Sequence, residues 1–138
     1  MDVDLPEGYT PTEKESYMND RQLEFFRRRL LDWKQELLKE SEQTVKRMRE
    51  GTLLEADPLD QGTSETEWAF ELRTRDRYRK LIKKIDQALE RIEDGSYGFC
   101  EETGEEIGIK RLMARPVATL SISAQERHER EERLQKGR

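Results

Sequence analysis

Two carboxylates flank a proline in the run DPLD, where Asp57 and Asp60 lie three positions apart. Such a pair could hold a magnesium ion or reach into the active site of another macromolecule. Asp-Pro is also a common way to open a turn, and the residues alone favour turn formation. No nucleophile or cluster of bases accompanies the pair, so the chain is not expected to be an enzyme.

A second candidate is the basic run RTRDRYRKLIKK at residues 73–84. Four of its cations share one helix face, because they recur at steps of four, three and four. They are Arg73, Arg77, Lys80 and Lys84. Such a stripe can bind phosphates or an acidic groove of a protein. Neighbouring acids could instead balance it as a solvated face, and the residues alone do not separate the two.

Cys100 follows an aromatic residue and a glycine, in the manner of a zinc ribbon, but Thr103 stands where a second cysteine would be expected. No other cysteine exists in the chain, and structural zinc sites are almost always closed by four ligands. His128 is the only histidine and is expected to be a solvated residue of a terminal helix. The residues therefore predict no bound metal, and a single cysteine excludes an internal disulfide.

A long helix is predicted to begin after Asn19, with Gln22 in capping-box spacing. Apolar residues then recur at alternating steps of three and four, which is typical of a coiled-coil seam. They are Leu23, Phe26, Leu30, Trp33 and Leu37. Gly51 is a natural stop for this helix, so residues 51–63 are predicted to form a turn.

A second helix is predicted from about residue 65 to Asp94, with Ser64 and Glu67 as its capping box. Its apolar side would consist of Trp68, Leu72, Ile82, Ile85, Leu89 and Ile92. The two helices would pair as a long antiparallel coiled-coil hairpin with its tip at residues 53–63.

Residues 95–121, called the knob below, contain four glycines that divide them into short segments. They predict a small hairpin at Gly104 and a short helix at residues 109–114. A terminal helix over residues 122–136 would be capped by Ser121 or Ser123. The expected fold is mainly α: an arm at 1–18, the hairpin at 19–94, the knob at 95–121 and a C-terminal helix at 122–138.

The composition is 33% hydrophobic and 41% charged, which suits a narrow buried seam better than a large core. A formal net charge of −5 argues against a protein that grips the DNA backbone, so no direct sequence-specific DNA binding is expected. No apolar segment lies near Met1 and no long uncharged run occurs, so we expect a cytoplasmic protein without a signal peptide or membrane span.

Three runs together resemble the DksA/TraR family of bacterial transcription factors: DPLD, ELRTRDRYRKLIKKI and YGFCEETGEEIGIKRLMARP. The resemblance extends from about Tyr17 to the terminal helix. It implies a protein that binds RNA polymerase rather than DNA, inserts its hairpin into the secondary channel and acts together with ppGpp. It also implies the long hairpin, a zinc-finger-like knob and a C-terminal helix, and we expect a monomer.

The resemblance assigns roles to the residues of the hairpin. Asp57 and Asp60 match the tip aspartates that approach the polymerase active site. Gln61 and Gly62 depart from the arginine and alanine of better-known members, and Gly62 loosens the backbone there. Arg77 matches a basic residue that binds polymerase, and Arg73 and Lys80 are assigned to the same surface.

The resemblance also implies a ppGpp pocket at the junction with polymerase. Leu81, Lys84 and Arg115 match positions that help to form it, and a guanidinium and an ammonium suit phosphate groups. Gln125 stands where the family has a lysine, so the response to ppGpp is expected to be weaker.

Zinc-binding members of the family carry C-x2-C-x17-C-x2-C. The four matching positions here are Cys100, Thr103, Ser121 and Ala124, so three ligands have been lost. The knob is therefore expected to fold by packing and hydrogen bonds without metal. It would keep working when zinc is scarce or thiols are oxidised, since it has no cluster to lose.

The leading hypothesis is a regulator that destabilises open complexes, inhibits stable-RNA promoters and supports amino-acid biosynthesis promoters as part of the stringent response. One alternative is a transcript-cleavage accessory factor of polymerase, which also carries acidic residues at a hairpin tip. Another is a structural coiled-coil adaptor, for which the tip aspartates would have no role.

Overall fold

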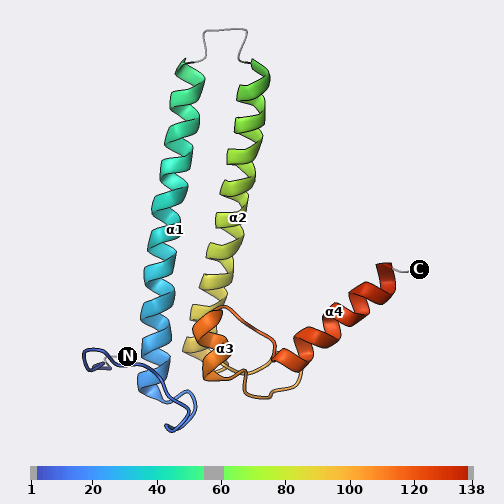
Figure 1. The fold of residues 1–138 in the computed structure, drawn as a ribbon. Coiled ribbons are helices and arrows are strands. Elements are labelled where there is room, and N and C mark those ends of the chain that lie inside the picture. Colours follow the sequence, from blue (N-terminus) through green and yellow to red (C-terminus); the bar gives the residue numbers. More distant parts are fainter. Residues whose placement is uncertain (1–2, 55–60, 137–138) are drawn as a thin grey trace. The chain divides into compact units, whose positions relative to one another are not determined.

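The computed structural model describes residues 3–54 and 61–136 and is mainly helical, as predicted (Figure 1). The helices are α1 (Asp20–Leu54), α2 (Gln61–Asp94), α3 (Ile109–Ala114) and α4 (Ile122–Lys136). Within the described residues β-structure is limited to one isolated antiparallel bridge between Phe99 and Glu106. The chain divides into two compact units, one made of residues 1–30 with 87–138 and the other of residues 31–86.

The cap predicted at the start of α1 is confirmed. Asn19 Oδ1 accepts a hydrogen bond of 2.9 Å from the backbone N–H of Gln22, and Gln22 Oε1 accepts one of 2.7 Å from the N–H of Met18. The buried Gln22 side chain also donates to the carbonyl of Thr12 and to Glu15. Asn19 therefore satisfies a free donor at the helix start, and the Gln22 side chain fixes the preceding arm to the helix.

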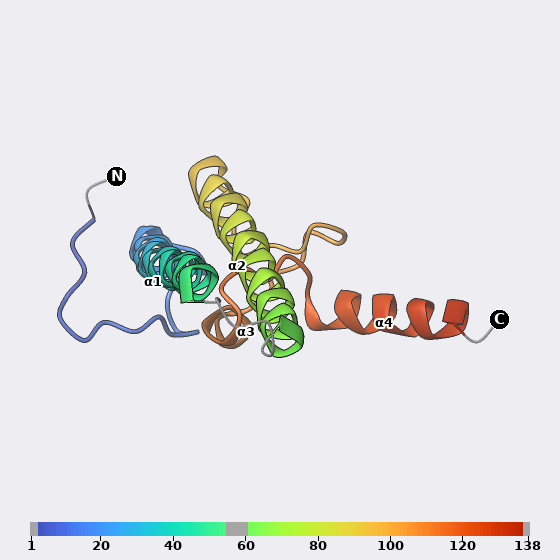
Figure 2. The ribbon, with the colours of Figure 1, turned by 90° about the horizontal axis from the view of Figure 1, so that it is seen from above.

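The unit of residues 31–86 is a pair of antiparallel helical segments from α1 and α2 (Figures 1 and 2). Its buried row contains Leu37, Thr44, Met48 and Ile85. Two ion pairs cross between the helices: Lys34 Nζ lies 2.7 Å from Asp86 Oδ1, and Arg47 Nη2 lies 3.6 Å from Glu71 Oε2. The buried seam between the two helices is narrow, so the two ion pairs add to the small apolar contact that the buried row provides.

The two helices extend further into residues 51–63 than the sequence predicts. α1 continues through Gly51 to Leu54, and α2 begins at Gln61 rather than near residue 65. Ser64 therefore lies inside the helix and not at its cap. A glycine inside a helix costs only about 1 kcal/mol relative to alanine, and each added residue gains a backbone hydrogen bond, so the helix extends past it.

The prediction that Trp68 and Leu72 lie in the seam is wrong. Their exposed fractions are 43% and 39%. At this level the half-buried positions of α2 include Glu71 and Thr74, and Glu71 forms its ion pair with Arg47. Polar contacts occupy the seam here, so the apolar side chains remain at the surface.

The other unit has its core where α1, α2 and the knob meet. Tyr97 is 1% exposed, its ring centroid lies 5.6 Å from that of Phe26, and its hydroxyl donates to the carbonyl of Pro116 at 2.7 Å. Further buried side chains surround this contact. They are Leu30, Ala88, Ile92, Ile107, Ile109, Leu112, Val117, Ala118 and Ala124.

The ends of the remaining elements follow local signals. α2 ends at Asp94, and Gly95 follows with φ of 84°, the left-handed conformation that glycine adopts readily after a helix. α3 and α4 occupy the residues predicted for them. Ser121 is the cap of α4, since its Oγ accepts a hydrogen bond of 3.3 Å from the N–H of Ala124.

Glu24 is a charged residue in this core that the apolar pattern did not reveal. Its side chain is 2% exposed, and it accepts hydrogen bonds of 2.7–2.8 Å from Arg27 and Arg28. The hydrogen bonds from Arg27 are the main reason that the pKa of Glu24 falls from 4.5 to about 2, against the opposing effect of burial. A buried carboxylate with two guanidinium partners stabilises the fold only while it is ionised.

We expect Glu24→Gln to lower the free energy of unfolding at pH 7 by about 1–3 kcal/mol, because charge-assisted hydrogen bonds are lost. Because the folded-state pKa lies below the unfolded one, the contribution is complete above pH 4.5 and disappears as the pH falls through about 2. Urea unfolding of wild type and variant from pH 7 to pH 2 measures the difference. The exposed Glu36→Gln serves as the control, and a wild-type advantage that does not shrink in acid would contradict this account.

Candidate functional site

Of the three residues predicted to act at the hairpin tip, the structure describes only one. Asp57 and Asp60 fall outside the described residues, so their role stays a prediction. Gly62 is the second residue of α2, and its backbone is therefore helical rather than part of a loose turn.

The basic stripe of α2 is free of acidic partners in the described part of the chain. Its four cations, Arg73, Arg77, Lys80 and Lys84, are exposed and form no ion pair with the described residues. The Arg77 guanidinium lies 5.6 Å from the ring centroid of the neighbouring Tyr78. A solvated face balanced by neighbouring acids would show such pairs, so this stripe is available to an anionic partner.

The four residues predicted to contact ppGpp fall in both units. Leu81 is half-buried and Lys84 is exposed on α2 within residues 31–86. Arg115 is exposed just after α3, and Gln125 on α4 donates a hydrogen bond of 3.2 Å to Glu129 of the same helix. The assignment of these residues to a ppGpp pocket remains a prediction.

The four positions that match zinc ligands do not fit a zinc ion. They supply one thiol, at Cys100, beside the hydroxyls of Thr103 and Ser121 and the methyl group of Ala124. Both hydroxyls already accept hydrogen bonds from backbone N–H groups, that of Thr103 from Glu105 and that of Ser121 from Ala124. Among the described residues no three His, Cys, Asp or Glu side chains come together to hold a metal.

Several hydrogen bonds converge on the sulfur of Cys100. The thiol is buried, which by itself raises its pKa, but the Thr103 side chain and the backbone of Ser121, Thr103 and Glu102 lower it to about 6. Two of the vacated ligand positions therefore direct hydrogen-bond donors at the remaining sulfur. The loop is also closed by its backbone, since the N–H of Cys100 donates to the carbonyl of Glu105 at 2.8 Å.

Tyr17 fastens the arm to the knob. Its hydroxyl donates to the carbonyl of Gly98 at 2.6 Å and accepts from the N–H of Gly108 at 2.9 Å. A Cβ at Gly98 would lie 2.8 Å from Met18 and 3.1 Å from the Tyr17 hydroxyl, and the φ of Gly98 is 91°. Glycine is needed here both for the close approach and for the positive φ. The arm therefore packs against the knob through Tyr17.

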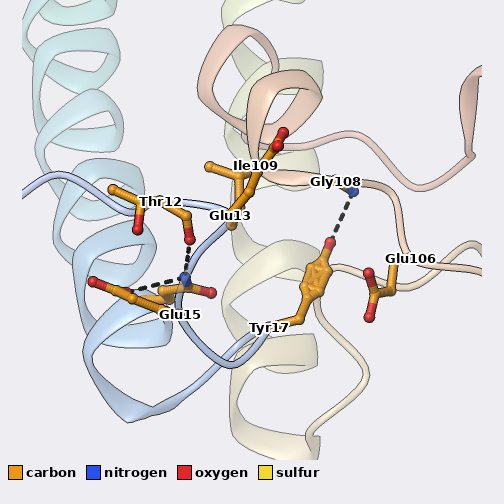
Figure 3. A pocket seen from close by; sticks show the side chains of 8 residues that line it. Thr12, Glu13, Glu15, Tyr17, Glu106, Gly108 and Ile109 are labelled. Atoms are coloured by element: carbon orange, nitrogen blue, oxygen red, sulfur yellow. Dashed lines mark hydrogen bonds between the residues drawn. The ribbon is translucent and has the colours of Figure 1, made fainter.

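A pocket of about 270 Å³ lies where the arm meets the knob (Figure 3). Its lining consists of Thr12, Glu13, Glu15, Tyr17, Gln22, Glu106, Gly108 and Ile109. Glu15 accepts a hydrogen bond of 2.6 Å from Tyr9, which lowers the pKa of Glu15, and burial with the same bond raises the pKa of Tyr9 to about 12. No nucleophile and base are paired in this lining, so we interpret the pocket as a gap in the packing between arm and knob and not as a catalytic site.

α4 is tied to the knob by Glu102. This carboxylate lies 2.8 Å from Arg127 Nη2 and forms a short ion pair with Nε2 of His128. The hydrogen bond that His128 donates to Glu102 raises the pKa of His128 and lowers the pKa of Glu102. The side chain of His128 is exposed on the terminal helix, as predicted, but the sequence did not show its partner, because a loop 26 residues earlier supplies it.

A helical hairpin followed by a knob with the positions of a four-ligand finger defines the structural class. Two family models match the chain: "DnaK suppressor protein DksA, N-terminal domain" over residues 22–92, and "Prokaryotic dksA/traR C4-type zinc finger" over residues 95–130. The chain belongs to the DksA/TraR family.

Curated relatives agree with this assignment. A protein of Caulobacter vibrioides named RNA polymerase-binding transcription factor DksA is 63% identical over 126 residues, which are 91% of this chain and 89% of the relative. The protein of the same name from Escherichia coli K12 is 47% identical over 116 residues, or 84% and 77% of the two chains. The solved structure of transcription factor DksA2 from Pseudomonas aeruginosa matches with a TM-score of 0.80 at 44% identity, covering 85% of this chain and 90% of that one.

The only histidine of the chain allows a direct test of the joint between knob and α4. We expect an NMR titration of His128 to show a pKa above 6.5 and Glu102→Gln to bring it back toward 6.5. Because the folded-state pKa is raised, the ion pair stabilises α4 fully below pH 6.5 and is lost as the pH rises through the folded-state value. Glu126→Gln is the control. Equal titration midpoints in wild type and Glu102→Gln would refute the pairing.

Proposed function

We propose that this protein binds RNA polymerase through its helical hairpin and regulates transcription initiation without catalysing a reaction. The relatives named as polymerase-binding transcription factors support this proposal, as does membership of their family. The observation that carries it is the stripe of exposed cations on α2 without acidic partners among the described residues. Such a face fits an acidic surface of a large partner.

The finer proposal places the hairpin in the secondary channel as a monomer, in the cytoplasm. Asp57 and Asp60 would approach the active site and destabilise open complexes. ppGpp would bind at the junction with polymerase near Leu81, Lys84 and Arg115, with Gln125 giving a weaker response than lysine would. None of the described helices combines the length and apolar character that a membrane span requires, and the proposal needs none.

Transcription in vitro from a ribosomal RNA promoter, with and without ppGpp, tests this function. We expect Asp60→Asn to retain polymerase binding and to lose inhibition, because the tip and not the stripe acts on the open complex. We expect Arg77→Ala to weaken binding about tenfold, since one charge-assisted contact contributes about 1.5 kcal/mol or more.

Asp76→Asn and Arg79→Ala are matched controls on the same helix and remove the same charges. An Asp60→Asn variant as inhibitory as wild type would favour a structural adaptor instead. Shortening of backtracked RNA from its 3′ end on addition of the protein would favour a transcript-cleavage factor.

We also propose that the knob works without metal, because the hydrogen bonds at Cys100 and the contacts of Tyr97 and Tyr17 hold it. We expect the purified protein to contain far less than one zinc per chain and its melting temperature to be unchanged by EDTA. Elemental analysis and thermal unfolding measure both. One zinc per chain, or a fall in melting temperature with chelator, would overturn this part of the proposal and leave polymerase binding untouched.

A further inference from the structure

A groove on the hairpin lies between α1 and α2 within the unit of residues 31–86. Its volume is about 390 Å³, in the range of sites that take small molecules. It is lined by Ser41, Glu42, Val45, Lys46, Arg49 and Arg75. Five of these residues come from α1, and Arg75 comes from α2.

Three cations line this groove. Lys46 and Arg49 are three positions apart on α1 and therefore neighbours on one helix face, and the half-buried Arg75 comes from the other helix. None of the three forms an ion pair with a described residue, whereas the adjacent Arg47 is paired with Glu71. Glu42 is the only acid in the lining, which leaves an excess of two positive charges.

Cations held together without a counter-charge repel one another, and the groove relieves this repulsion when an anion enters. A single carboxylate would neutralise one cation. Adjacent phosphate groups concentrate several charges in a small volume, and each offers the paired oxygens that an arginine fork matches. Ser41 adds a hydroxyl that can donate to a phosphate oxygen.

We propose that this groove binds an oligophosphate anion, either an inorganic chain or the phosphate chain of a nucleotide. Lys46, Arg49 and Arg75 hold the phosphates, two from one helix and one from the other. None of these residues belongs to the polymerase stripe or to the predicted ppGpp positions. Arg75 lies six residues before Leu81, which is about 9 Å along a helix axis. The site therefore goes beyond the proposed function.

Isothermal titration calorimetry of the isolated 138-residue protein in low salt tests the site. Tripolyphosphate and ATP are the probes, and adenosine is the uncharged comparison. We expect both anions to bind with one site per chain and adenosine not to bind. The double variant Lys46→Gln/Arg49→Gln and the single variant Arg75→Gln should each weaken binding tenfold or more.

Lys39→Gln/Arg79→Gln removes the same charge from exposed positions outside the groove and should change affinity less than twofold. Equal affinity for the two anions identifies the phosphate chain alone as the ligand, and tighter binding of ATP shows that the nucleoside contributes; both results support the site. Absence of binding at millimolar anion, or equal loss in the groove and control variants, would overturn it. Polymerase is absent from this titration, so a negative result would not contradict the proposed function.

Discussion

The buried phenol of Tyr97 is the contact on which the unit of residues 1–30 and 87–138 depends. Its ring packs on Phe26 of α1 directly after α2 has ended, and its hydroxyl reaches Pro116 beyond α3. One side chain at the start of the knob thus joins α1 to the segment that follows α3. A chain with 33% hydrophobic residues has too few apolar side chains to surround the Tyr97 contact with a second layer of core. The remaining order must come from hydrogen bonds that fix backbone segments to one another.

The knob carries the positions of a four-ligand finger, and hydrogen bonds join its backbone segments. A zinc ion would fix four ligands, two from each of two C-x2-C segments, at one point. Here these segments and their neighbours are fixed separately. The N–H of Cys100 donates to Glu105, the N–H of Glu101 donates to Thr119, and the Tyr17 hydroxyl holds Gly98 and Gly108. Each bond contributes about 1 kcal/mol, so no single one replaces the metal, and the arm becomes part of the fold because it supplies Tyr17.

Much of the fold could be predicted because local signals agree with it. The Asn19 cap, Gly95 after α2 and the Ser121 cap of α4 are all encoded within a few residues of the helix ends that they set. The predictions that miss the structure concern contacts that local sequence signals do not encode. Trp68 fits the apolar period, yet polar contacts fill the seam at its level, and the partner of His128 comes from a loop distant in sequence. The spacing of Glu24 to Arg27 and Arg28 was visible, but only the structure shows that Glu24 is buried.

The charge pattern of the hairpin follows from the same thin seam. Residues 73–84 contain seven cations and one acid, although the whole chain has a net charge of −5. The acids Asp86 and Glu71 are used in ion pairs across the seam with Lys34 and Arg47, and so they are unavailable to the stripe. Unpaired cations at this density repel one another and weaken an isolated hairpin. In return for this loss of stability, the unpaired cations create a positive electrostatic potential over one face of the hairpin. Such a field would steer an anionic partner toward the hairpin before any specific contact is made.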